Sequence, residues 1–231
     1  MPNVGGTLVY RWGNTGINNE FAFKREGIMD VKEENKLQKI TKSPYEKIPI
    51  KFNFINNLGA LEQVLSYTST CINTSTGVST KATIINTDSI LAGGTVVSVV
   101  VQAGTIGEKH KITVTATTNF GNILEYDCIL DVADDLTSSF RKQSGEKKVI
   151  QNDFTPVLGT GDSINTFVVS ATKMSDGTTA SITSFSTKSS PYILTTVSSG
   201  ISREKYHIRI RIVSTLGYQY EKSVVMEVED I

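Results

Sequence analysis

Few residues in this chain have the types and spacing that catalysis or metal binding requires. The 231 residues include two histidines, His110 and His207, which lie far apart in the sequence. A metal site needs several histidine, cysteine or carboxylate ligands at close spacing. His207 also falls on the polar side of a strand pattern, so we expect surface histidines. The sequence predicts no metal site, no cofactor and no enzymatic activity.

The two cysteines, Cys71 and Cys128, are predicted to be core residues. When the two halves of the chain are aligned, Cys71 falls opposite Ala171 and Cys128 opposite Val224. A cysteine at an inward position behaves as a small hydrophobic residue. Two cysteines are too few for a disulfide scaffold, and a reducing compartment disfavours the single bond that they could form.

Two glycine-containing stretches are predicted to be loops. GTIGEK, from Gly104 to Lys109, lacks the spacing of a phosphate-binding loop and precedes a strand where such a loop would precede a helix. GTGDS, from Gly159 to Ser163, offers one carboxylate, so a weak calcium site remains only as an alternative to a plain loop.

Carboxylates that could pair for glycosidic cleavage are predicted to lie on a solvated sheet face. They are Asp127, Asp131, Glu227 and Glu229. Cleavage by paired carboxylates needs a concave site as well, and Trp12, the only tryptophan available as a sugar platform, lies outside both predicted domains.

Two long stretches repeat one another without a gap. They read GEKHKITVTATTNFGNILEYDCILDVAD, from Gly107 to Asp134, and REKYHIRIRIVSTLGYQYEKSVVMEVED, from Arg203 to Asp230. Each alternates apolar and polar residues, which is typical of a half-buried antiparallel strand. Each then has a turn with Gly121 or Gly217 and resumes as a second strand, so both are predicted to be hairpins.

The match extends upstream through further short runs of β-branched residues. These runs are Ser66 to Thr68, Lys81 to Ile85 and Thr95 to Val101 in the first half, and Asn165 to Ser170, Ala180 to Ile182 and Tyr192 to Val197 in the second. Short strands at close spacing predict β-sandwiches. A repeat spacing of about 96 to 100 residues indicates duplication of a whole domain. The predicted fold class is all-β, with two tandem sandwiches.

The predicted domains are residues 43–133 and 149–231, joined by a polar linker at 134–148 without a strand pattern. Residues 1–42 are predicted to form an extended arm, with a short helix beginning near Asp30. The arm carries four aromatic residues that need a surface on which to be buried: Tyr10, Trp12, Phe21 and Phe23.

Composition excludes several classes of protein. Lysine and arginine total 23, as do aspartate and glutamate, whereas a nucleic-acid binder usually has a basic surplus. No apolar run is long enough to span a membrane. The first residues, MPNVGGTLVYRWGNTG, lack the pattern of a secretory signal, so we expect synthesis in a cytosol.

Several stretches resemble phage-encoded immunoglobulin-like domains. DFTPVLGTGDSI, from Asp153 to Ile164, is similar to the entry of such a domain, and GISREKYHIRI, from Gly200 to Ile210, to a later strand. The hairpin with Gly217 and Glu221 resembles the last two strands, and AGTIGEKHKI, from Ala103 to Ile112, repeats the pattern. The first domain has NNLGAL in place of the Gly-Asp-Ser-Ile entry. The resemblance implies an immunoglobulin-like fold and a structural role in a virion, and it supplies no catalytic residues.

The main functional hypothesis is therefore a capsid decoration protein, anchored on the major capsid protein by its aromatic arm. A tail or neck component is the first alternative, with other virion proteins or further copies of the chain as partners. A carbohydrate- or cell-surface-binding module, using Tyr192 or Tyr218 on a host glycan, is the second. Each virion hypothesis places a protein made in the host cytoplasm in the finished particle.

Overall fold

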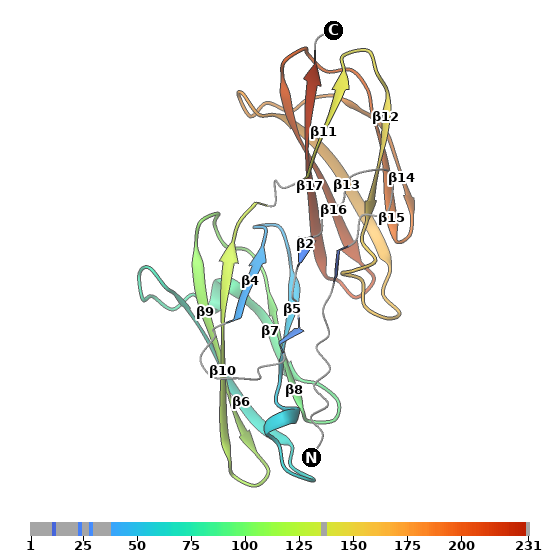
Figure 1. Ribbon diagram of the computed structural model, residues 1–231. Helices are drawn as coiled ribbons and strands as arrows, with labels where there is room; N and C mark the ends of the chain where they lie inside the picture. Colours follow the sequence, from blue (N-terminus) through green and yellow to red (C-terminus); the bar gives the residue numbers. More distant parts are fainter. Residues whose placement is uncertain (1–10, 13–22, 25–27, 30–37, 135–137, 230–231) are drawn as a thin grey trace. The chain divides into compact units, whose positions relative to one another are not determined.

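The computed structural model describes residues 11–12, 23–24, 28–29, 38–134 and 138–229. From residue 23 onward, the chain divides into two compact units, Phe23–Ala133 and Asp134–Ile231. Each unit is a sandwich of two β-sheets (Figure 1), so the predicted fold class is confirmed. The predicted helix near Asp30 lies outside the described residues.

In the first domain, one sheet has the strand order β4-β10-β9-β6 and the other β3-β5-β8-β7. The strands are β3 (Ile28–Met29), β4 (Gln38–Lys42), β5 (Ile48–Asn53), β6 (Val64–Asn73), β7 (Ile85–Ile90), β8 (Val96–Val101), β9 (Lys109–Thr118) and β10 (Ile123–Val132). A 3-10 turn η1 (Ile55–Asn57) and a one-turn helix α1 (Lys81–Ile84) connect them. The short strands β1 (Arg11–Trp12) and β2 (Phe23–Lys24) form a separate pair.

The second domain repeats this plan with one strand fewer. Its sheets have the orders β11-β17-β16-β13 and β12-β15-β14. The strands are β11 (Ser138–Gln143), β12 (Lys148–Asp153), β13 (Ile164–Lys173), β14 (Thr183–Ser189), β15 (Tyr192–Val197), β16 (Lys205–Ser214) and β17 (Gln219–Glu229). Pairing of β9 with β10 and of β16 with β17 confirms the two predicted hairpins.

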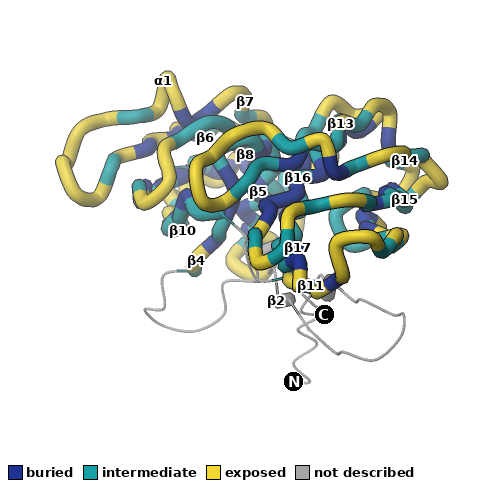
Figure 2. The backbone as a smooth tube through the Cα atoms, turned by 90° about the horizontal axis from the view of Figure 1, so that it is seen from above, coloured by how far each residue is buried: buried dark blue, intermediate teal, exposed yellow. Residues whose placement is uncertain are grey.

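The alternation read from the sequence places the apolar side chains between the sheets. Along β9 the burial pattern alternates strictly, and Ile112, Val114 and Ala116 are fully buried. Ile208, Ile210 and Ile212 occupy the same places in β16. Figure 2 shows the buried residues along the strands and the exposed ones at the turns.

The predicted domain boundaries need two changes, one at the start of each domain. Strand β4 lies within the predicted arm, and it pairs in parallel with β10. Strand β11 lies in the stretch predicted to contain no strand, and it pairs in parallel with β17, so that prediction is wrong. Both are short polar strands at a sheet edge, where one neighbour and little apolar surface are enough.

Two further runs also differ from their prediction as strands. Residues 81–84 form α1, because Ile84 turns into the core while the three residues before it remain exposed. Residues 180–182 precede β14 without belonging to a strand.

Candidate functional site

Each domain has a buried lysine near the end of the strand that pairs in parallel with its last strand, Lys42 in β4 and Lys142 in β11. Lys42 is fully buried, and its Nζ donates to the carbonyl oxygens of Ser43 at 2.7 Å and Ala103 at 2.5 Å. Lys142 occupies the same place in the second domain, where its Nζ donates to Gln143 O at 2.6 Å and Ser199 O at 2.7 Å. Burial lowers the pKa of the Lys142 ammonium. A buried ammonium that donates to carbonyl groups fixes the turn to the opposite loop.

A glutamate closes the same turn in both domains. Glu46 Oε2 accepts from the backbone N–H of Ser43 at 2.8 Å, and Glu146 Oε2 accepts from Gln143 N–H at 3.0 Å. The shared pattern of lysine, three residues, glutamate and lysine begins at Lys42 and again at Lys142. This repeat was the available sequence signal that β4 and β11 belong to the domains.

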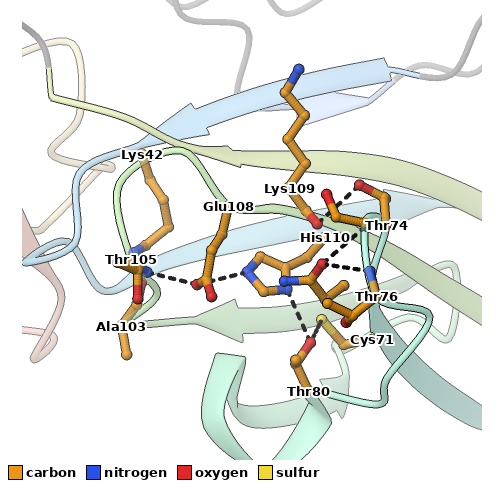
Figure 3. A network of polar contacts seen from close by, with 12 residues as sticks. Lys42, Cys71, Thr74, Thr76, Thr80, Ala103, Thr105, Glu108, Lys109 and His110 are labelled. Atoms are coloured by element: carbon orange, nitrogen blue, oxygen red, sulfur yellow. Dashed lines mark hydrogen bonds and ion pairs between the residues drawn. The ribbon is translucent and has the colours of Figure 1, made fainter.

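The first domain also contains a polar network that the second lacks (Figure 3). His110 Nδ1 lies 3.0 Å from Thr80 Oγ1, which lies 3.3 Å from Cys71 Sγ. On the other side of the ring, His110 Nε2 lies 3.5 Å from Glu108 Oε2. In the second domain, the positions of Cys71, Thr80, His110 and Glu108 are occupied by Ala171, Ala180, Tyr206 and Glu204, in that order.

A carboxylate, an imidazole and a hydroxyl in this order are the parts of a general-base relay. Here the imidazole is 1% exposed, and the threonine hydroxyl is already in contact with both the ring and the thiol. Burial raises the pKa of the Cys71 thiol, which keeps it protonated and weakens it as a nucleophile. We therefore interpret the network as a structural one that holds α1, which begins directly after Thr80.

The prediction that the histidines lie at the solvated surface is wrong for both. His110 points into the network, and His207 is 5% exposed although it stands on the outward side of β16. Burial lowers the pKa of His207, and the positive charge of Arg209 adds to that effect. His207 is therefore neutral near pH 7, and among the described residues it belongs to no group of three or more possible metal ligands.

The predicted core position of the cysteines is confirmed, because both are fully buried and free. Both pair in register with Ile112 of β9, Cys71 from β6 and Cys128 from β10. Two strand spacings separate them, about 9 to 10 Å, which exceeds the Cα separation of about 7 Å that a disulfide allows. A disulfide between them would require the sheet to rearrange.

Burial raises the pKa of the Cys128 thiol to about 12. Its proton therefore stays bound in the folded chain and is released from the unfolded chain above a pH of about 8.5. The stability that this proton contributes is complete below that pH and is lost as the pH rises towards 12. We expect wild-type protein to lose about 2 kcal/mol of unfolding free energy between pH 8.5 and pH 10.5 through this group.

Cys128→Val is the matched variant, because Val224 stands at this position in the second domain. Urea unfolding of both proteins at the two pH values, monitored by hydrogen exchange in β9 and β10, measures how much unfolding free energy each loses. Equal losses in the wild type and the variant would contradict the prediction.

The loops singled out in the sequence have structural roles. Gly104 to Lys109 forms a turn, as predicted, with Glu108 Oε2 accepting from Thr105 N–H at 2.7 Å. Asp162, the candidate calcium ligand, uses Oδ1 to accept from Thr215 Oγ1 at 2.8 Å and so clamps the β16–β17 hairpin. Glu62 does the same for the β9–β10 hairpin by accepting from Thr118 Oγ1 at 2.6 Å.

The outward carboxylates form ion pairs across neighbouring strands. Lys111 Nζ lies 2.7 Å from Asp127 and Lys39 Nζ lies 2.7 Å from Asp131. Arg141 contacts both Glu227 and Glu229 in the second domain. These pairs agree with the predicted solvated face. Tyr192 and Tyr218, the candidate glycan contacts, are half-buried.

Four exposed apolar side chains gather at one end of the first domain. Leu61 is 89% exposed, and Leu65, Phe120 and Ile123 are 63–70% exposed. Asn119 ties the two segments together, because its Oδ1 accepts from Gln63 N–H and its Nδ2 donates to Leu61 O. The corresponding residues of the second domain are Gly161, Asn165, Leu216 and Gln219. The scaffold is thus duplicated while the outer surface differs.

The predicted arm anchors stay a prediction. Tyr10 and Phe21 lie outside the described residues, and Trp12 and Phe23 are described only as parts of the backbone pair β1–β2. Among the described helices, none has the length and apolar character to cross a membrane.

Comparison with protein families gives one match. Residues 42–131 match the model of the family described as "Podophage GP4 fiber-tail adaptor protein gp77". The match runs from the end of β4 to β10, which is the first domain and less than half of the chain. It supports the predicted class of bacteriophage structural protein, and it favours the tail alternative over capsid decoration. No curated protein matches the chain.

Solved structures with related architecture have low sequence identity. A titin I-band fragment, I67–I69, is 11% identical over 83% of this chain, with a TM-score of 0.28, and the chain spans 64% of that fragment. A chimeric titin Z1Z2 tandem is 12% identical over 85% of this chain and 97% of its own, with a TM-score of 0.32. SporoSAG from Toxoplasma gondii is 11% identical over 83% of this chain and 97% of its own, with a TM-score of 0.28. These likenesses carry no argument about function.

Proposed function

We propose that this bacteriophage structural protein, a tandem of immunoglobulin-like domains, is a non-enzymatic tail component that connects other virion proteins. The observation that carries the proposal is the family match over residues 42–131, whose description names an adaptor between fibre and tail. The exposed apolar residues at one end of the same domain supply area that a protein partner can bury. Two domains with one scaffold and unlike surfaces suit a connector that has a different neighbour at each domain.

Location in the particle tests this proposal. Gold-labelled antibody against the chain should mark the tail, and quantitative mass spectrometry of purified particles should give far fewer copies than a shell protein needs. Particles assembled without the chain should have heads and lack an appendage. Labelling spread over the head at a copy number close to that of the major capsid protein would support capsid decoration instead.

We also propose that the four aromatic residues of the arm anchor the chain on its virion partner. A connector needs a tight attachment at one end, and buried aromatic side chains dominate the binding energy of many interfaces. Because β4 belongs to the first domain, a deletion test must stop before residue 38.

Deletion of residues 1–24 removes all four aromatic residues and leaves β3 in place. If each anchor contributes about 2 kcal/mol, incorporation into particles should fall at least tenfold while the melting temperature of the domains is unchanged. Deletion of residues 1–9 is the control, because it retains every aromatic residue. Full incorporation of the longer deletion, measured by mass spectrometry of particles, would exclude the anchor.

A further inference from the structure

The two domains differ at the outer edge of the sheets that contain β5 and β12. In the first domain β3 occupies the outer side of β5, with Ile28 opposite Lys51 and Met29 opposite Phe52, and runs parallel to it. Strand β12 is the counterpart of β5, and within the described part of the chain no strand pairs with its outer side. As far as the structure is described, this strand position is occupied in the first domain and open in the second.

The backbone of β12 presents hydrogen-bonding groups at this open edge. The N–H of Phe154 donates to Pro191 O at 3.0 Å, and Asn152 pairs with Ile193. Hydrogen bonds in an antiparallel pair come from alternate residues, so Val149 and Gln151 direct their backbone groups away from β15. At one end of the edge, Lys222 Nζ donates to Asp153 O.

The open edge also lacks the proline that blocks the same position in the first domain. In the first domain the position of Val149 is occupied by Pro49, which has no N–H to donate. Val149 retains its N–H, and its side chain is 65% exposed. Unprotected edges of this kind pair with extended segments of other chains.

Among the described residues that directly precede β12, none is left over to fill the position. Strand β10 ends at Val132 and β11 begins at Ser138, so only a few residues lie between them. All of β11 is used in the other sheet, where it pairs with β17. Within the described part of the chain, therefore, no segment occupies the outer side of β12.

Asn152 indicates the chemistry of that strand. It replaces Phe52, the residue opposite Met29 in the first domain. Asn152 is 5% exposed, and its Nδ2 has no hydrogen-bond partner among the described residues. A buried amide donor without an acceptor is unfavourable. A methionine thioether, the side chain type at position 29, accepts hydrogen bonds only weakly. A side chain with an oxygen atom would be a better acceptor for Asn152 Nδ2.

We propose that the outer edge of β12 binds an extended segment of a different virion protein, parallel to β12, with an oxygen-bearing side chain opposite Asn152. The segment completes the second sheet as β3 completes the first. This inference deepens the proposed function by naming the contact of the second domain, and it requires only that the chain be part of a particle.

Site-specific photo-crosslinking in assembled particles tests the inference. A photoreactive residue at position 151 of the full chain should form a crosslink to one defined segment of another virion protein. The same residue at position 113, on the interior strand β9 of the first domain, is the control and should give none. Val149→Pro, which copies Pro49, should reduce the crosslink from position 151 at least tenfold, whereas Val149→Thr, which keeps the N–H, should not. Asn152→Phe, which copies Phe52, should also reduce it.

Crosslinks from position 151 only to this chain or to a second copy would overturn the inference. An undiminished crosslink in Val149→Pro protein with its normal hydrogen-exchange pattern would overturn it too. The proposed tail function fails on a different result. Gold labelling of the head together with a defined crosslink to another protein would refute the tail assignment and still support the β12 contact.

Discussion

Replacing Gly104 with alanine is expected to destabilise the first domain by about 3 kcal/mol. Gly104 has a φ of +93°, and a Cβ atom built on it would lie 2.8 Å from Cγ2 of Val132. The substitution therefore combines a left-handed backbone, which alanine adopts at a cost, with a clash against a fully buried strand residue. Urea unfolding with hydrogen exchange in β9 and β10 measures the loss.

Gly107 separates these two contributions. Its φ is +90°, yet a Cβ atom there would have no neighbour within 4 Å. Gly107→Ala should therefore cost only the backbone strain, about 1 kcal/mol. Gly200 repeats the situation of Gly104 in the second domain, with a φ of +119° and Val228 Cγ2 at 2.7 Å. Equal losses for Gly104→Ala and Gly107→Ala would show that contact with Val132 is unimportant.

Replacing Lys42 with methionine is expected to cost the first domain about 2 to 3 kcal/mol. Methionine fills a similar volume but donates no hydrogen bond, so the carbonyl groups of Ser43 and Ala103 lose the ammonium that now satisfies them. Relief from burying the charge offsets part of that cost. The loss of stability should be larger because Ala103 has a φ of +50°, a conformation that the hydrogen bond from Lys42 to its carbonyl oxygen stabilises.

Lys109→Met is the matched control, since Lys109 is exposed at the start of β9. A surface substitution of this kind should change the unfolding free energy by less than about 0.5 kcal/mol. Chemical denaturation of both variants, read by hydrogen exchange in β4 and β10, gives the comparison. A Lys42→Met protein as stable as the control would contradict the role assigned to the buried ammonium.

Sequence periodicity was sufficient for the interior of each sandwich. Alternation from Ile112 to Ala116 and from Ile208 to Ile212 is strong because one face of each strand is fully buried and the other is polar. The alignment of the two halves then transferred each inward position, including Cys128, from one domain to the other. Fold class and the two long hairpins followed from these patterns.

Sequence periodicity could not predict the edge strands or the burial of polar side chains. Strands β4 and β11 have little apolar alternation, because an edge strand is held by backbone pairing and, here, by Lys42 or Lys142. His207 stands on the polar face of β16, and nothing in its spacing shows that burial will lower its pKa. The network through His110 and Thr80 depends on α1, which a run of β-branched residues had predicted to be a strand.

The parallel pairing of β4 with β10 and of β11 with β17 has a mechanical consequence. Gln38–Lys42 lies beside the end of β10, and Ser138–Gln143 beside the end of β17, with the chain running the same way in both members of each pair. A pull that enters a domain at its first strand and leaves at its last therefore acts along the hydrogen-bonded seam from opposite ends. All the bonds of the seam share that load together, and a domain built in this way resists extension until they rupture as a group.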